Sequence, residues 1–167
     1  MDPRVSHYER LQIDSLLHPR DAAKVQPGVA LFLSPKAHSA QYLYDMAVGP
    51  ALRENGVNRI DVTRVFSSDS PLVEMSRWLL SAEIIIAELS TVTNGDLMYT
   101  LGLAHGLGRC PLLLVQHDAE LPFNLAGLRH VQYTRSVSGL LTLREDLTRA
   151  VRVFLAAARA NDGGHAA

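Results

Sequence analysis

The chain has 167 residues, of which 47% are apolar and 20% are charged. This length and composition are typical of one globular domain that buries a core without disulfides or metals, and they exclude a disordered chain. The formal net charge of -1 provides no strong attraction to nucleic acid or to anionic membranes. We therefore expect no nucleic acid and no membrane as partners.

The sequence offers no signal for export, disulfide chemistry or metal binding. Its longest apolar runs contain about five to seven residues, whereas a bilayer span needs roughly 20, and residues 1–10 lack an apolar signal core. We expect a cytoplasmic protein. The only cysteine, Cys110, precedes Pro111 at the entrance of an expected strand, which favours a small buried side chain over a nucleophile. No metal-ligand spacing is present, and we expect no metal and no cofactor.

Strands and helices are predicted to alternate along the chain. Residues 1–27 form an N-terminal appendage, and 159–167 form a tail that we expect to be disordered. The expected elements are a strand over 29–33, a helix over about 40–55 that bends at Pro50 and stops at Gly56, a strand over 59–66, a helix ending at Ser81, a strand ending at Glu88, a helix after Asp96, a strand over 111–116, a strand over 131–133 and a helix over about 138–158.

This alternation predicts the fold. Strands that alternate with helices of ten or more residues imply a parallel sheet with right-handed crossovers. We predict one α/β domain over 28–158, a flavodoxin- or Rossmann-like three-layer sandwich whose five-stranded parallel sheet has the order 2-1-3-4-5. In that order the first and third strands are neighbours, so their ends at Ser34 and Glu88 face one crevice, where open α/β sheets bind ligands.

The stretch over 83–109 contains the candidate site. An apolar, β-branched strand ends at Glu88, a polar loop with Ser90, Asn94 and Gly95 follows, and Asp96 occupies the expected N-cap position of a helix. A strand end beside a helix N-terminus favours ligand binding, because the first N–H groups of the helix are unpaired. Structural alternatives stay open: Glu88 can hold the loop, Asp96 can serve only as a cap, and the loop residues can serve only the turn.

Four further side chains, one at the end of the first strand and three on the helix after Asp96, have alternative or simpler expected roles. Ser34 either hydrogen-bonds a sugar or phosphate or ends the strand ahead of Pro35. His105 has apolar neighbours, so we expect it to be half-buried rather than a ligand contact, and we expect Tyr99 and Met98 to lie in the core.

The central run SAEIIIAELSTVTNGDLMYTLGLAHGLGRCPLLLVQ, with LPFNLAGLRHVQY after it, resembles the nucleoside 2-deoxyribosyltransferase-like proteins and their nucleotide-binding relatives. The likeness covers about residues 28–155, and its core, YTLGLAHGLG, is more specific than a lone glycine motif. The resemblance implies that the partner is a small-molecule nucleoside or nucleotide.

Three acidic positions of that family differ here. In the family's enzymes a glutamate attacks the anomeric carbon of a nucleoside to form a glycosyl-enzyme, and a second acid helps the base to leave. The corresponding residue is Thr100, whose hydroxyl is a poor nucleophile without an adjacent base and carries no charge to stabilise a cationic transition state. The family's strand-end aspartate is Glu88, and the aspartate of its LPFDL segment is Asn124.

These departures favour a binding domain that acts as a sensor or regulatory module. Its expected ligand contacts are Ser34, Asp69, Ser90, Asn94, Gly95, Thr100 and Asn124. The alternative is an active N-glycoside hydrolase or transferase on a nucleoside, nucleotide or NAD-like substrate, with Glu88 as the main carboxylate and Asp96 as its partner. A third hypothesis is an interaction module that assembles as a homo-oligomer.

Overall fold

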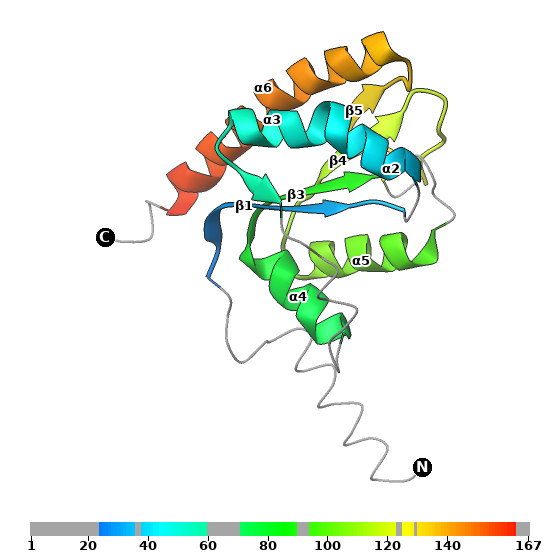
Figure 1. Cartoon of the computed structure of the whole chain (residues 1–167). Helices are drawn as coiled ribbons and strands as arrows, with labels where there is room; N and C mark the ends of the chain where they lie inside the picture. The colour runs from blue at the N-terminus through cyan, green and yellow to red at the C-terminus, as the bar shows by residue number, and fades with distance from the viewer. Residues whose placement is uncertain are drawn as a thin grey trace, which may run out of the picture.

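The computed structural model describes residues 24–35, 38–59, 71–89, 94–122, 125–128 and 130–162. Its five strands form one sheet in the order β2-β1-β3-β4-β5, and every neighbouring pair is parallel. Helices cover both faces of the sheet, α3 and α6 on one and α4 and α5 on the other (Figure 1). The predicted α/β three-layer fold and its strand order are confirmed.

The elements follow the predicted alternation. They are β1 (Gln26–Leu33), α2 (His38–Leu43), the π-helical segment η1 (Tyr44–Val48), α3 (Gly49–Glu54), β2 (Asn58–Arg59), α4 (Pro71–Ser81), β3 (Ala82–Glu88), α5 (Gly95–Gly106), β4 (Leu112–Gln116), β5 (His130–Tyr133) and α6 (Val137–Asp162). The final helix passes its predicted end at 158 and includes the first residues of the predicted tail. Most of the predicted second strand, 60–66, and the first 23 residues of the appendage lie outside the described residues.

The helix predicted over about 40–55 contains a π-helical segment ahead of Pro50. The N–H of Gly49 donates to the carbonyl of Tyr44, five residues back. Pro50 follows in the first turn of α3, where its missing N–H costs least. The helix stops as predicted at Gly56, whose φ of 70° lies in the left-handed region that glycine adopts without strain.

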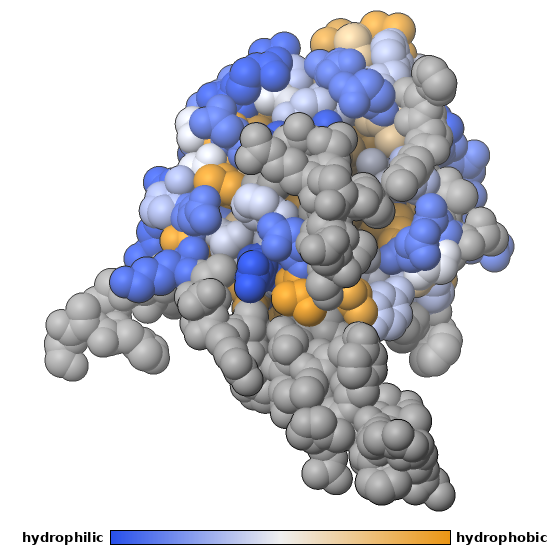
Figure 2. Space-filling view, turned by 60° about the horizontal axis from the view of Figure 1, so that its bottom comes forward, coloured by the Kyte–Doolittle hydropathy of each residue, from blue (hydrophilic) through white to orange (hydrophobic). Residues whose placement is uncertain are grey.

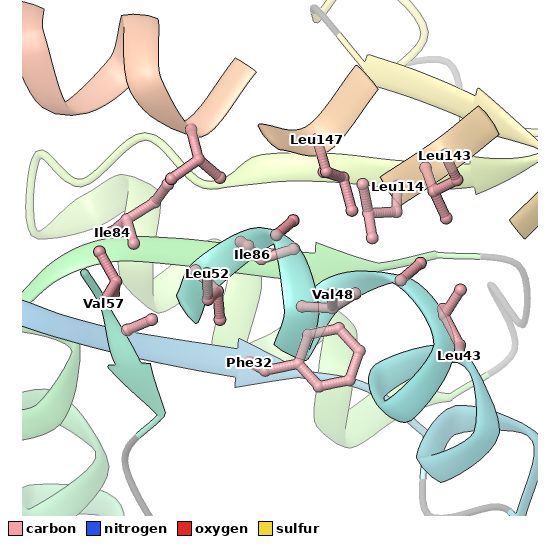
Figure 3. Packing of buried hydrophobic residues seen from close by; sticks show 14 of the residues in the cluster. Phe32, Leu43, Val48, Leu52, Val57, Ile84, Ile86, Leu114, Leu143 and Leu147 are labelled. Atoms are coloured by element: carbon pink, nitrogen blue, oxygen red, sulfur yellow. The ribbon is translucent and has the colours of Figure 1, made fainter. Parts of the chain in front are cut away.

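The strand β3 divides the core into two layers. All seven of its residues are buried, as expected of a central parallel strand covered on both faces. Ile84 and Ile86 pack in the layer beneath α3 and α6, where Leu143 and Leu147 of α6 approach the sheet (Figure 3). Ile85 packs in the opposite layer with the buried residues of α4 and α5. Alternate residues of one strand therefore hold the two helical layers together.

A buried carboxylate joins three elements at the amino edge of the sheet. Glu83 Oε2 accepts a hydrogen bond of 2.6 Å from the N–H of Gly28, whose φ is 75°. Arg159, on the last turns of α6, donates from Nε to Glu83 Oε1 at 2.7 Å and from Nη2 to Oε2 at 3.2 Å. The Arg159 hydrogen bond holds the pKa of Glu83 below its usual value, with help from the Gly28 N–H and against the effect of burial. Arg109 adds hydrogen bonds to the carbonyls of Ala82 and Glu83.

The face of the molecule seen in Figure 2 has the mixed polarity typical of folded domains. Figure 2, with the lower side of Figure 1 turned forward, shows hydrophilic residues interspersed with small groups of hydrophobic ones. Within the described part of the chain, no helix combines the length and the apolar character that crossing a membrane requires.

We expect Glu83→Gln to lower the free energy of unfolding by about 1–2 kcal/mol at pH 7, because the amide can still accept from Gly28 but cannot pair with the charge of Arg159. The cost stays moderate because the Arg159 side chain is 59% exposed to solvent. The control is Glu74→Gln, which removes a surface ion pair with Arg77 and should cost less than about 0.5 kcal/mol.

The same pair predicts a pH dependence. Because the folded state lowers the pKa of Glu83, its ionised form contributes its full stabilisation above the unfolded value of about 4.5, and that contribution is lost as the pH falls through the folded value. The difference between wild type and Glu83→Gln in urea unfolding should therefore shrink below pH 4.5. A difference that stays constant from pH 4.5 down to pH 3 contradicts the assigned ion pair, because the ionised Glu83 should lose part of its stabilisation over this range.

Candidate functional site

The candidate site lies at the carboxyl edge of the sheet, between β1 and β3. Leu33 pairs with Ala87 in the parallel ladder, so the next positions, Ser34 and Glu88, lie side by side at the strand ends. After β1 the chain continues to β2 on one side and then to β3 on the other, so this edge is the topological switch point of the sheet. Ser34 is half-buried there. The structure thus brings two predicted site residues together.

Glu88 is held inside the protein by a tyrosine from the last strand. Its side chain is only 3% exposed, and the hydroxyl of Tyr133 donates to Glu88 Oε1 at 2.9 Å. Tyr133 ends β5, which lies beyond β4, so the hydrogen bond spans an intervening strand on the face covered by α6. Sequence reasoning missed this partner. One sequence feature could have indicated it: Tyr133 is the last residue of the fifth predicted strand, so its side chain was expected at the same carboxyl edge as Glu88.

The helix α5 is capped by Asn94, so the predicted cap, Asp96, is wrong. Asn94 has an extended backbone, and its Oδ1 accepts a hydrogen bond of 3.0 Å from the N–H of Leu97. Asn and Asp are equally good caps, and here the helix begins at Gly95, one residue before Asp96. Asp96 instead lies exposed in the first turn, where its negative charge is favourable near the positive end of the helix.

Two further predicted contacts lie on α5. Gly95 is exposed, and a Cβ added there would meet no atom within 4 Å, so this position has room for a side chain. Thr100 is half-buried, and its hydroxyl donates to the carbonyl of Asp96 at 2.8 Å. The hydroxyl proton of Thr100 is therefore directed at its own helix backbone, in the back-bonding usual for threonine in helices.

The two candidate carboxylates belong to opposite layers. Glu88 bonds Tyr133, which packs in the layer under α6. Asp96 belongs to α5, which packs through Leu97 and Leu101 against the other face of the sheet. A glycosidase pair needs both carboxylates on either side of one scissile bond. The geometry gives no support to Asp96 as the catalytic partner of Glu88.

Three predictions of burial near the site are wrong. Tyr99 is 57% exposed, and His105 and Cys110 are also exposed. The face of α5 that meets the sheet is formed by Leu97, Leu101 and Ala104, and Tyr99 lies about 200° around the helix from Leu97. His105 belongs to the last turn, and Cys110 lies in the connection before β4 begins. Met98, by contrast, packs partly buried against the core as predicted.

Three predicted ligand contacts, Asp69, Ser90 and Asn124, lie outside the described residues. Among the residues that are described, no three His, Cys, Asp or Glu side chains are grouped in a way that could hold a metal ion.

Comparison with known proteins leaves the family open. No model of a known protein family matches the chain, and no curated protein matches it. The resemblance of the central motif to the deoxyribosyltransferase-like family therefore stays a hypothesis.

We expect Asn94→Ala to lower the free energy of unfolding by about 1 kcal/mol, because the N–H of Leu97 loses its acceptor at the start of α5. Asp96→Ala should cost less, roughly 0.3–0.5 kcal/mol, because only a favourable interaction with the helix dipole is lost. Thermal unfolding of both variants in one buffer measures the difference. A larger loss from Asp96→Ala than from Asn94→Ala would mean that the cap is misassigned.

We expect Tyr133→Phe to destabilise the protein by about 1–3 kcal/mol, because Glu88 Oε1 loses a buried hydrogen-bond donor while the packing of the ring is kept. Tyr99→Phe, the same change at an exposed site on α5, should leave stability within about 0.5 kcal/mol. Denaturant unfolding measures both values. Equal stabilities of Tyr133→Phe and wild type would show that the hydrogen bond contributes nothing to the fold.

Proposed function

We propose that the chain is a nucleoside- or nucleotide-binding domain of the deoxyribosyltransferase-like family that acts as a sensor or regulatory module without the family's usual glutamate nucleophile. The proposal includes a cytoplasmic setting, as expected from the sequence. It rests on the YTLGLAHGLG motif together with the position of that motif on α5, directly after the strand that ends at the switch point.

The observation that carries the binding proposal is the open start of α5. Its first N–H groups are at the carboxyl edge of a parallel sheet, beside the end of β3. Asn94 accepts from the N–H of Leu97, so the N–H groups of Gly95 and Asp96 are the ones proposed to meet a ligand, and a Cβ added at Gly95 would meet no atom within 4 Å. Helix N-termini in this position bind phosphates and other anions, because unpaired N–H groups and the helix dipole act together. A nucleotide phosphate or a ribose hydroxyl fits this chemistry.

The absence of transferase chemistry is proposed from Thr100. Its hydroxyl donates to the carbonyl of Asp96, and a threonine supplies no carboxylate nucleophile at this position. Glu88, the carboxylate of the alternative enzyme hypothesis, is engaged by Tyr133 on the face away from α5. Both contacts favour binding without base release over an active N-glycoside hydrolase or transferase.

The first test is a thermal-shift screen of the purified chain against nucleosides, nucleotides, their deoxy forms and NAD, followed by analysis of each mixture for free base. A ligand at 100 times its Kd adds about 2.7 kcal/mol of stability, which raises the Tm of a domain of this size by roughly 5–10 °C. We expect a shift with the ligand intact. No shift across the panel contradicts the proposal, and free base that disappears in Glu88→Gln establishes the enzyme hypothesis instead.

A matched pair of variants locates the site. Gly95→Glu places a carboxylate at the start of α5, and Gly106→Glu places one at its other end; at both glycines an added Cβ meets no atom within 4 Å. We expect Gly95→Glu to keep its Tm but lose the nucleotide-induced shift by charge repulsion, and Gly106→Glu to keep the shift. If both variants respond to nucleotide as the wild type does, the ligand binds elsewhere.

A further inference from the structure

The outer face of α6 carries a row of exposed side chains spaced four residues apart. In order, the row consists of Val137, Leu141, Glu145, Arg149, Val153 and Ala157, and all six are exposed. Its large apolar members are Val137, Leu141 and Val153, which are 61%, 49% and 69% exposed, respectively. Residues four apart form a continuous ridge on a helix surface. The opposite face of α6 packs on the sheet through Leu143 and Leu147 (Figure 3).

No described element covers this row. In Figure 1, α6 runs along the upper side of the molecule, α3 lies below it, and no other labelled helix or strand is drawn above it. Exposed apolar residues that occur singly need no explanation, but here they flank a charged centre at regular spacing. The pattern is apolar, acidic, basic, apolar over Leu141, Glu145, Arg149 and Val153.

This pattern is complementary to itself when reversed. If a second α6 lies antiparallel across the first, with the two-fold axis passing midway between Glu145 and Arg149 on the outer face, position 141 faces 153 and position 145 faces 149. Each Glu145 then meets the Arg149 of the partner, and each Leu141 meets the Val153 of the partner. A two-fold interface uses the same patch twice, so such self-complementarity is its requirement. A parallel arrangement in register would place like charges opposite each other.

A groove beside the row gives the partner's side chains a place to lie. It has a volume of about 420 Å³ and is lined by Leu141, Glu145 and Arg149 of the row together with Glu54, Arg144 and Thr148. On the side of the groove away from the row, the charge of Glu54 is balanced by Arg144. Glu54 also accepts a hydrogen bond of 3.2 Å from the hydroxyl of Thr148. Arg149 forms an ion pair with Asp146, which lies beside the row. Its side chain is 70% exposed, so its charge stays accessible to a partner.

We propose that two copies of this chain associate through an antiparallel contact between the outer faces of their α6 helices, centred between Glu145 and Arg149 and held by reciprocal Glu145–Arg149 pairs between apolar flanks. Ridges of residues four apart favour a crossing angle near −50°. One helix pair buries less than the roughly 1,200 Å² of a stable interface, so the dimer is weak and reversible, with a Kd in the micromolar to millimolar range. The association does not depend on the proposed ligand.

Sedimentation velocity from about 1 µM to 1 mM protein tests the proposal, because this range brackets the expected Kd. We expect a monomer–dimer equilibrium that weakens as salt increases, since the central pairs are exposed to solvent. Arg149→Glu and Glu145→Arg should each weaken the dimer at least about tenfold, because every reversal acts twice across the symmetric contact. The double swap Glu145→Arg with Arg149→Glu re-forms the pairs and should restore it.

One variant that removes an apolar side chain of the row and one control on another surface complete the test. Val153→Ser removes an exposed side chain of the row and should weaken the dimer without lowering the Tm of the monomer. Tyr99→Ser removes an exposed aromatic side chain of α5, on the other side of the sheet, and should leave the dimer intact. A monomer at all concentrations overturns the proposal. The proposal is also overturned if Arg149→Glu leaves the dimer unchanged or if the double swap fails to restore it. Disruption by Tyr99→Ser alone would place the contact on another surface and overturns it as well.

Discussion

The structure depends on hydrogen-bond and ion-pair partners for two carboxylates on β3, a strand that is buried along its whole length. β3 carries Glu83 near its start and Glu88 at its end, and both side chains are buried. A buried charge is tolerated only when it is paired and hydrogen-bonded. Glu83 obtains its partners from Gly28 and Arg159, and Glu88 obtains one from Tyr133. The requirement therefore ties both edges of the sheet to elements distant in sequence.

The same constraint shapes the candidate site. Glu88 is bonded on the face beneath α6, and among the described residues the end of β1 and the start of α5 lie at the same carboxyl edge. This arrangement suits binding at backbone N–H groups better than chemistry at a carboxylate pair. Thr100 agrees with it, since its hydroxyl is engaged within α5.

The sequence was informative where a pattern repeats and uninformative where distant side chains meet. Continuous apolar runs predicted β3 and β4, and the alternation of strands with helices predicted a parallel sheet, for which the order was expected from the flavodoxin-like fold that five strands suggest. The Glu88–Tyr133 hydrogen bond joins residues 45 positions apart, and periodicity carries no information about it. Arg159 was placed in the tail because its role depends on Glu83, far away in the chain. The cap was misplaced because Asn94 and Asp96 are chemically equivalent caps two residues apart.

The helix α6 connects the site to the proposed interface. Tyr133 lies just before Ser136, whose Oγ accepts from the N–H of Gly139 and so caps the start of α6. The hydrogen bond to Glu88 thus lies one short turn away from the first residues of the outer row. A ligand at the carboxyl edge changes dimerisation only by binding monomer and dimer with unequal affinity, and dimerisation then changes ligand affinity by the same factor. The proposed dimer forms without the ligand, and two contacts that lie between these regions are the hydrogen bond from Tyr133 to Glu88 and the Ser136 cap of α6.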